Sequence, residues 1–490
     1  MNPLLTLAAS APLLIVCGLL AARVKATPAA LIAIIVAIAV SLAWFPIDGA
    51  TALDTAGTLG PLVLEVVLII LGGVLLAEIL TASGAQSTIA QWLTSACRGR
   101  GRVVLLISLG VTPFAESVTG FGLGVIVAIP LLIHIGLSRT KAAVVALLGL
   151  VLVPWGALAP GTLIAARLGG VDFVGVGVWG AVFTLPVLLI TTPVVLVIAV
   201  GRVQARRSIV DAVIAIGVLW SSLIAANLLL GPPLAGATAS LVTILAILLV
   251  ARIVERNRLH ADRTLGRALL PYGVLVLGLL TTSVLDRMLP LGMTGRILAS
   301  PALWLFVTAA LALRLLRLMP DLVPTLVRSS ARRGIPVALT TGLFLVLGGL
   351  MAASGTSLYL AQAASQLGPA YLLFIPLIGA IGGYVTGSNS GSAAMFSAST
   401  AQAAITIGAD PLTAVAAQNV AASAATMASP PRVALAMSVA AATADAEPAA
   451  VIGHDALESE GPLRSAPVTQ VTLLVATSIA VTLGLWLLVL

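Results

Sequence analysis

Long apolar runs recur along the chain, and each approaches the length that a lipid bilayer demands. A spanning helix needs about 20 predominantly apolar residues, and about twelve such runs can be recognised by that criterion. They lie at 3–22, 28–47, 60–81, 142–163, 174–200, 209–229, 235–251, 268–285, 297–315, 335–353, 412–443 and 468–490. Only 9% of the residues are charged, against about 25% in soluble domains. The chain is therefore predicted to be an all-α polytopic membrane protein.

Two further apolar stretches are too long for one span and are interrupted by Gly, Ser and Thr. We call 103–137, interrupted by VTPFAESVTGFGLG, the first broken segment, and 370–407, interrupted by GGYVTGSNSGSAAMF, the second broken segment. Backbone that leaves the helix at bilayer depth must be satisfied by protein or by water in a cavity. The arms of the first segment, 103–113 and 125–137, would be about 16 and 20 Å long, enough to reach the bilayer midplane. Two re-entrant hairpins are expected.

Basic residues support the hairpin interpretation of the first broken segment. Arg100 and Arg102 precede it, and Arg139 and Lys141 follow it. Lys and Arg accumulate in cytoplasmic loops, so both ends are predicted to face the cytoplasm. The second broken segment has no such flanking clusters. It is predicted to enter from the opposite side.

Short motifs recur in the two halves of the chain. LGG at 71–73 recurs at 347–349, and VTG at 118–120 recurs at 385–387. Matches in the same order, together with broken segments of opposite orientation, predict an inverted repeat. The predicted units are a first repeat at 1–200, linking helices at 201–267 and a second repeat at 268–490.

Each broken segment is followed by an apolar run that has its own interruption. The first contains LVPWGALAPG at 152–161, and the second contains MASPPRVA at 427–434. Proline removes a backbone donor and kinks or breaks a helix. Helix N-termini that converge on one point offer free N–H groups and partial positive charge, so four breaks near the midplane would suit an anion. The alternative is that these prolines only kink the helices.

Glu116 and Arg432 are the charged residues expected at this point. An ionised, unpaired carboxylate near the bilayer centre is costly, which favours uptake of a proton, so Glu116 is the candidate proton carrier. Its alternative is to cap the second hairpin arm or to pair with a fixed cation. Arg432 could bind a carboxylate bidentately or pair with a structural acid.

Small polar residues and glycines at the two tips are the other predicted substrate contacts, because glycine lets backbone approach a ligand closely. They are Ser117, Thr119, Gly120 and Gly122 at the first tip, and Thr386, Gly387, Ser388, Asn389, Ser390 and Ser392 at the second. Such groups suit a hydroxy-carboxylate, yet the turn at 388–390 could equally coordinate Na⁺. Packing alone also favours small residues in membrane helices.

Both interruptions resemble the lactate permease family. VTPFAESVTGFGLGVIVAIPLL is similar to that family's stretch around LEGAAGFG, and PLIGAIGGYVTGSNSGSAAMFSASTAQAA to its stretch around FLTGSDTSSN. The resemblance implies proton-coupled uptake of lactate and glycolate by a fold with two hairpins and two unwound helices. Glu116 matches the family's glutamate. The family's acid is replaced by Asn389, its lysine near Thr426 is missing, and Arg432 replaces a small polar residue, which leaves the substrate open within a class.

The sequence thus predicts a secondary active transporter of small organic monocarboxylates, driven by proton symport, in the bacterial-type inner (cytoplasmic) membrane. Na⁺ coupling is the alternative mechanism, and a passive channel is a further one. No HExxH, paired-histidine or GxSxG motif occurs, which argues against an enzyme. No cofactor, resident metal or nucleic-acid partner is expected.

Overall fold

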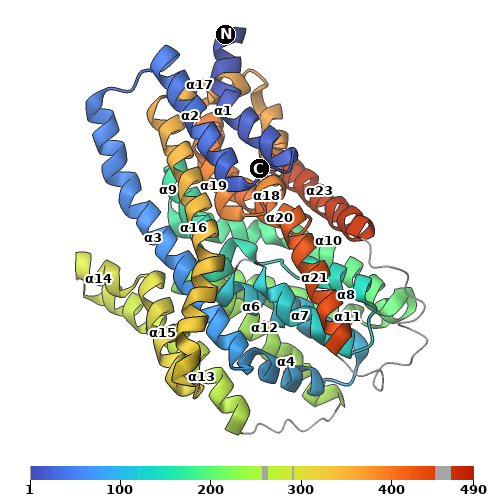
Figure 1. Cartoon of the computed structure of the whole chain (residues 1–490). Helices are drawn as coiled ribbons and strands as arrows, with labels where there is room; N and C mark the ends of the chain where they lie inside the picture. The colour runs from blue at the N-terminus through green and yellow to red at the C-terminus, as the bar shows by residue number, and fades with distance from the viewer. Residues whose placement is uncertain (1, 121, 256–262, 290–291, 447–464) are drawn as a thin grey trace.

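The protein is helical throughout the part that the computed structural model describes (Figure 1). The described ranges are 2–120, 122–255, 263–289, 292–446 and 465–490. Phe121 in the first broken segment, 256–262 in the predicted linking unit and 447–464 in the predicted second repeat lie outside these ranges. Within the ranges, no strand is present, which agrees with an all-α protein.

Eleven helices among the described residues are long and apolar enough to cross a membrane. Two of these candidates, Arg100–Thr119 and Gly368–Thr386, lie in the broken segments. The helices that match predicted runs are α1 (Pro3–Ala21), α2 (Ala26–Trp44), α3 (Gly49–Ala82), α10 (Phe173–Arg207), α11 (Ile209–Leu230), α12 (Pro232–Glu255), α13 (Arg263–Met288), α16 (Val323–Ala353) and α23 (Ser465–Val489). The multi-pass prediction is confirmed.

Three of the predicted runs do not form a single helix of spanning length. The run at 297–315 contains only α15 (Pro301–Leu315), a helix of 15 residues, and the runs at 142–163 and 412–443 are each broken into two helices. Short elements join the longer ones: α4 (Ala85–Ser95), α14 (Met293–Leu298), η3 (Pro320–Leu322), α17 (Thr356–Ser365) and η4 (Gly368–Ala370).

Helices α3 and α16 pack against each other along the molecule, between α17 at one end and α4 at the other (Figure 1). Glycines permit the close approach, as small residues do in membrane proteins. A Cβ atom at Gly349 of α16 would lie 1.9 Å from Cδ1 of Leu59 on α3, and one at Gly72 would lie 2.9 Å from Cβ of Leu305 on α15. This pairing joins helices far apart in the sequence.

The first broken segment forms two packed arms, but its break lies later than predicted. Helices α5 (Arg100–Leu105), η1 (Leu106–Val111) and α6 (Thr112–Thr119) follow one another directly. Helix α7 (Leu123–His134) begins after Gly120 and Gly122, both of which have positive φ. The expected first arm, 103–113, is therefore too short. Pro113 lies in the first turn of α6, after the π-helical turn η1, where its missing N–H is tolerated.

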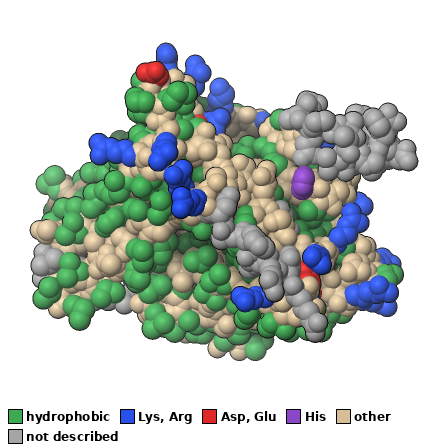
Figure 2. Space-filling view, turned by 90° about the horizontal axis from the view of Figure 1, so that it is seen from below, with side chains coloured by type: hydrophobic (Ala, Val, Ile, Leu, Met, Phe, Trp, Pro, Cys, Tyr) green, Lys and Arg blue, Asp and Glu red, His purple; other side chains and the backbone are tan. Residues whose placement is uncertain are grey.

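The far ends of these two arms are tied together. Nη2 of Arg100, at the start of α5, donates a hydrogen bond to the carbonyl of Ile135, just after α7, at 3.2 Å. Arg102 pairs with Asp211, at 3.0 Å, and with Glu255. These bonds fasten the base of the segment to α11 and α12. Figure 2 shows the molecule from this end, where Lys and Arg side chains far outnumber acidic ones.

The second broken segment also forms two packed helices, α18 (Tyr371–Thr386) and α19 (Asn389–Thr406). The two helices are separated only by residues 387 and 388, a shorter interruption than the polar stretch GGYVTGSNSGSAAMF suggests. Gly387 has a φ of 67°, a left-handed conformation that glycine adopts at no steric cost, and Ser388 caps α19 by accepting a hydrogen bond from the Gly391 N–H at 3.3 Å.

Both helices predicted to be interrupted are interrupted. Between α8 (Arg139–Leu148) and α9 (Pro160–Gly169), the backbone passes through the short helix η2 (Val153–Leu158). Ala157, Leu158 and Ala159 all have positive φ there. The second interruption, at 427–429, separates α20 (Pro411–Thr426) from α21 (Pro430–Ala446).

Candidate functional site

One cavity of about 410 Å³ lies where the two tips and the two interrupted helices meet. Its floor is buried, whereas Lys25, Pro336 and Pro431 at its edge are exposed. The lining comprises Lys25, Ala26, Thr27, Glu116, Val153, Gly156, Ala157, Pro160, Gly161, Pro336, Val337, Thr340, Thr341, Phe344, Thr386, Gly387, Ser388, Asn389, Ser390, Pro431, Arg432 and Leu435. The predicted convergence of four broken elements is thus present.

Glu116 and Arg432 form an ion pair in the wall of this cavity. Nη1 of Arg432 is 3.1 Å from Oε1 of Glu116, and the two side chains are only 8% and 1% exposed. The Gly122 N–H also donates to both carboxylate oxygens, at 3.1 and 3.0 Å, and the Gly124 N–H to one at 3.4 Å. Glu116 therefore accepts hydrogen bonds at the start of α7 and pairs with a cation, and Arg432 pairs with an acid. Proton carriage by Glu116 and substrate binding by Arg432 stay predictions.

Close contacts fix the positions of the two tips. A Cβ atom at Gly120 would lie 2.5 Å from Cβ of Ala157, and one at Gly387 would lie 2.6 Å from Cγ of Pro431. Each tip therefore rests on an interrupted helix. Glycine is required at both positions, since φ is 69° at Gly120 and 67° at Gly387.

Asn389 also lines the cavity, and its side chain is buried. It is 5% exposed, and among the described residues neither its Oδ1 nor its Nδ2 makes a hydrogen bond. A Cβ atom at Gly161 would lie 2.4 Å from Nδ2, so the amide fills the space that this glycine leaves. A buried unpaired amide costs about 1–3 kcal/mol. A polar ligand in the cavity would remove that cost.

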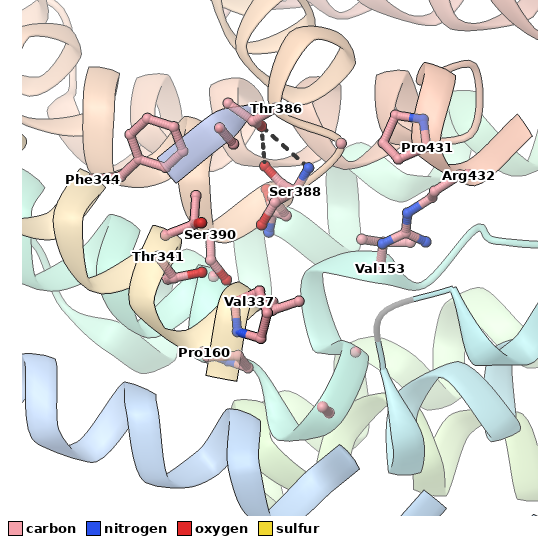
Figure 3. A pocket seen from close by; sticks show the side chains of 18 of the residues that line it. Val153, Pro160, Val337, Thr341, Phe344, Thr386, Ser388, Ser390, Pro431 and Arg432 are labelled. Atoms are coloured by element: carbon pink, nitrogen blue, oxygen red, sulfur yellow. Dashed lines mark hydrogen bonds between the residues drawn. The ribbon is translucent and has the colours of Figure 1, made fainter. Parts of the chain in front are cut away.

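Figure 3 shows how these walls face one another. Arg432 and Pro431 lie at one side, Thr341 and Phe344 of α16 at the other, and Ser388 lies between them. The hydroxyl of Thr386 accepts from the Ser388 N–H at 3.2 Å and donates to the Ser388 carbonyl at 2.9 Å. The second tip therefore presents an ordered turn.

The cavity contains only some of the predicted contact residues. The predicted residues that line it are Glu116, Thr386, Gly387, Ser388, Asn389, Ser390 and Arg432. Those that do not are Ser117, Thr119, Gly120, Gly122 and Ser392. The hydroxyls of Ser117 and Thr119 donate to carbonyls of their own helix, at 2.7 and 2.6 Å. Ser392 donates to the Gly379 carbonyl at 3.0 Å and joins the arms of the second segment.

Sequence reasoning missed one wall altogether. Lys25 and Thr27 come from the start of α2, and Thr340 and Thr341 come from the middle of α16. Lys25 resembles an ordinary loop cation, and paired threonines are common in membrane helices. The hydrogen bond between the hydroxyls of Thr27 and Thr340, at 2.8 Å, joins residues too far apart in the chain for pattern reasoning to connect.

Comparison with protein families decides the class. The model of the L-lactate permease family matches residues 5–284 and 274–448. The chain belongs to the L-lactate permease family. Membership implies that this multi-pass protein transports lactate across a membrane, which makes it a permease and not an enzyme. A comparison with curated proteins finds no match.

Proposed function

We propose that this permease is a proton symporter of small 2-hydroxy monocarboxylates, including lactate and glycolate, in the cytoplasmic membrane. The observation that carries the proposal is the buried Glu116–Arg432 pair in the cavity wall. Arg432 could bind an anion, but it is paired with Glu116, the only carboxylate among the described lining residues.

That pairing supplies a coupling mechanism. A proton taken up by Glu116 removes the charge that holds Arg432, and the guanidinium can then bind the carboxylate of the substrate bidentately. Without the proton, substrate and Glu116 compete for one cation. Without the substrate, protonation leaves Arg432 unpaired in a buried site, which is unfavourable. Proton and anion therefore bind best together.

The second tip provides the polar contacts for the rest of the substrate. The amide of Asn389 can both donate to and accept from a 2-hydroxyl group, and Thr386, Ser388 and Ser390 stand beside it in the lining. Gly387 lets the turn approach. We propose that the predicted residues outside the lining shape the two tips instead of contacting the substrate. They are Ser117, Thr119, Gly120, Gly122 and Ser392.

We also propose that the two broken segments are re-entrant hairpins in an inverted repeat, with the unit boundaries predicted from the sequence. Two related turns support this. After α3, Gly84 has a φ of 71°, and the hydroxyl of the preceding Ser83 donates a hydrogen bond to the Leu80 carbonyl. After α16, Gly355 has a φ of 77° and follows Ser354. The Ser354 hydroxyl bonds to the Met351 carbonyl in the same way. In each half, this turn precedes a broken segment.

Na⁺ coupling remains a second candidate because of one observation. Oδ1 of Asn389 is a buried carbonyl oxygen with no hydrogen-bond partner among the described residues, and hard cations prefer oxygen ligands. Ser388 and Ser390 are its neighbours in the turn. This candidate predicts that Na⁺, and not a pH gradient, drives uptake.

The substitution Glu116→Gln separates the two. It removes the titratable proton, so uphill accumulation of labelled lactate under an imposed pH gradient should be lost, whereas exchange of lactate across the membrane can persist. Glu78→Gln is the matched control, because Glu78 pairs with Arg333 outside the cavity. Undiminished accumulation by Glu116→Gln would rule out Glu116 as the proton carrier.

A further inference from the structure

The helix α2 begins at the wall of the cavity. Its first residues, Ala26 and Thr27, and its N-cap residue Lys25 all line the cavity. The Thr27 hydroxyl holds this end of the helix against Thr340 of α16. A helix terminus, a lysine and the substrate cavity therefore coincide.

The first turn of α2 presents free backbone donors at this point. The N–H groups of Ala26 and Thr27 have no acceptor within the helix, Pro28 has no N–H, and the Ala29 N–H donates to the Lys25 carbonyl at 3.2 Å. Lys25 provides no side-chain cap. The two free N–H groups and the helix dipole favour an anion.

The charges of the cavity point to the same end. Among the described lining residues, the charged ones are Lys25, Glu116 and Arg432. Glu116 and Arg432 neutralise each other, whereas Lys25 forms no ion pair with a described residue. The net positive charge of the lining therefore lies at Lys25. The unpartnered, buried amide of Asn389 in the same cavity independently indicates a polar ligand.

We propose that Lys25 and the N-terminus of α2 form a second anion subsite, which holds the substrate carboxylate while Glu116 is ionised and paired with Arg432. This subsite deepens the proposed function and rests on it. Once Glu116 takes up a proton, Arg432 becomes available, and the carboxylate moves from the α2 subsite to Arg432. Anion binding at Lys25 thus precedes protonation.

Arg432 is the charged side chain that the structure pairs with Glu116. Helix α6, which carries Glu116, is contacted by η1, η2, α3, α7 and α12. The titratable or charged residues of these elements are Asp54, Glu65 and Glu78 of α3, His134 of α7, and Arg252 and Glu255 of α12. None of them lines the cavity, so Lys25 is the group there that can hold an anion before protonation.

Three variants test the subsite without touching the Glu116–Arg432 pair. Lys25→Gln removes the charge. Ala26→Pro removes one backbone N–H at the first helical position, where proline is favoured. The residue before it, Lys25, already has the extended backbone that precedes proline, with φ −58° and ψ 144°. Arg23→Gln is the control, since it makes the same charge change in the same loop at a residue outside the lining.

The measurement is L-lactate binding to the purified full-length protein by calorimetry. Lys25→Gln and Ala26→Pro should each weaken binding roughly tenfold, as loss of a charge-assisted contact does, and Arg23→Gln should bind like the wild type. In a Glu116→Gln background, where Arg432 is available, the effect of Lys25→Gln should shrink to about twofold.

Binding by Lys25→Gln and Ala26→Pro within twofold of the wild type would overturn the subsite and leave the proposed function standing. No lactate binding by the wild-type protein would overturn the proposed function, and the subsite with it. Equal losses in all three variants, Arg23→Gln included, would show only a general effect of loop charge and would also overturn the subsite.

Discussion

Replacing both members of the Glu116–Arg432 pair in a double-mutant cycle would measure how strongly the site depends on it. At 3.1 Å and an effective dielectric constant of about 20, the Coulomb attraction is about 5 kcal/mol. Exposed pairs contribute about 0–1 kcal/mol, but these side chains are 8% and 1% exposed. Removing one partner of a buried pair costs about 3–5 kcal/mol.

The two single variants should differ in the free energy of unfolding. Arg432→Gln leaves the carboxylate with the amide donors of Gly122 and Gly124, whereas Glu116→Gln removes the ionic partner of Arg432. Because Arg432 also lines the cavity and can turn toward water there, we expect the lower end of the range, about 3 kcal/mol, for Glu116→Gln. Arg432→Gln should cost less.

Denaturant unfolding of the purified protein provides the assay. The double variant Glu116→Gln/Arg432→Gln should be more stable than Glu116→Gln alone, with a coupling energy of about 2–3 kcal/mol. Lactate should restore part of the stability of Glu116→Gln, because the anion replaces the missing carboxylate. A coupling energy below about 0.5 kcal/mol would show that the two side chains do not depend on each other.

Three other outcomes follow. Arg432→Lys keeps the charge but loses the bidentate geometry, so lactate affinity in uptake assays should fall roughly tenfold; an unchanged affinity would assign Arg432 a structural role only. Gly161→Ala places a Cβ atom 2.4 Å from Nδ2 of Asn389 and should displace the amide. Lactate uptake should therefore be abolished in protein that still elutes as a folded peak, and normal uptake would exclude Asn389 as a substrate contact. Cysteines that replace Arg100 or Arg139 should be labelled only from the cytoplasmic side. Labelling of either one from outside would contradict a re-entrant hairpin at 103–137.

Much of the fold could be predicted because lipid imposes simple rules on sequence. Apolar runs of spanning length became helices, and the proline-rich interruptions at 152–161 and 427–434 became breaks. The end of the first arm could not be predicted in this way. Ser117 and Thr119 look like loop residues, but their hydroxyls bond to carbonyls of their own helix, so α6 continues to Thr119.

The site was only partly predictable, for a different physical reason. Glu116 and Arg432 stand out as charges in apolar runs, but their pairing depends on how helices 316 positions apart in the chain pack. Lys25 carries no such signal, since a lysine between two spans is ordinary. Its place in the cavity follows from tertiary structure, in which the start of α2 lies against α16.

Uptake of labelled L-lactate into proteoliposomes, with pH and Na⁺ gradients imposed separately, shows whether protons drive transport. Proton symport through Glu116 predicts that an inwardly directed proton gradient drives accumulation above equilibrium. It also predicts that a Na⁺ gradient at equal pH does not, and that Glu116→Gln abolishes the proton-driven component. Accumulation driven by Na⁺ alone, or proton-driven accumulation that survives in Glu116→Gln, would contradict it.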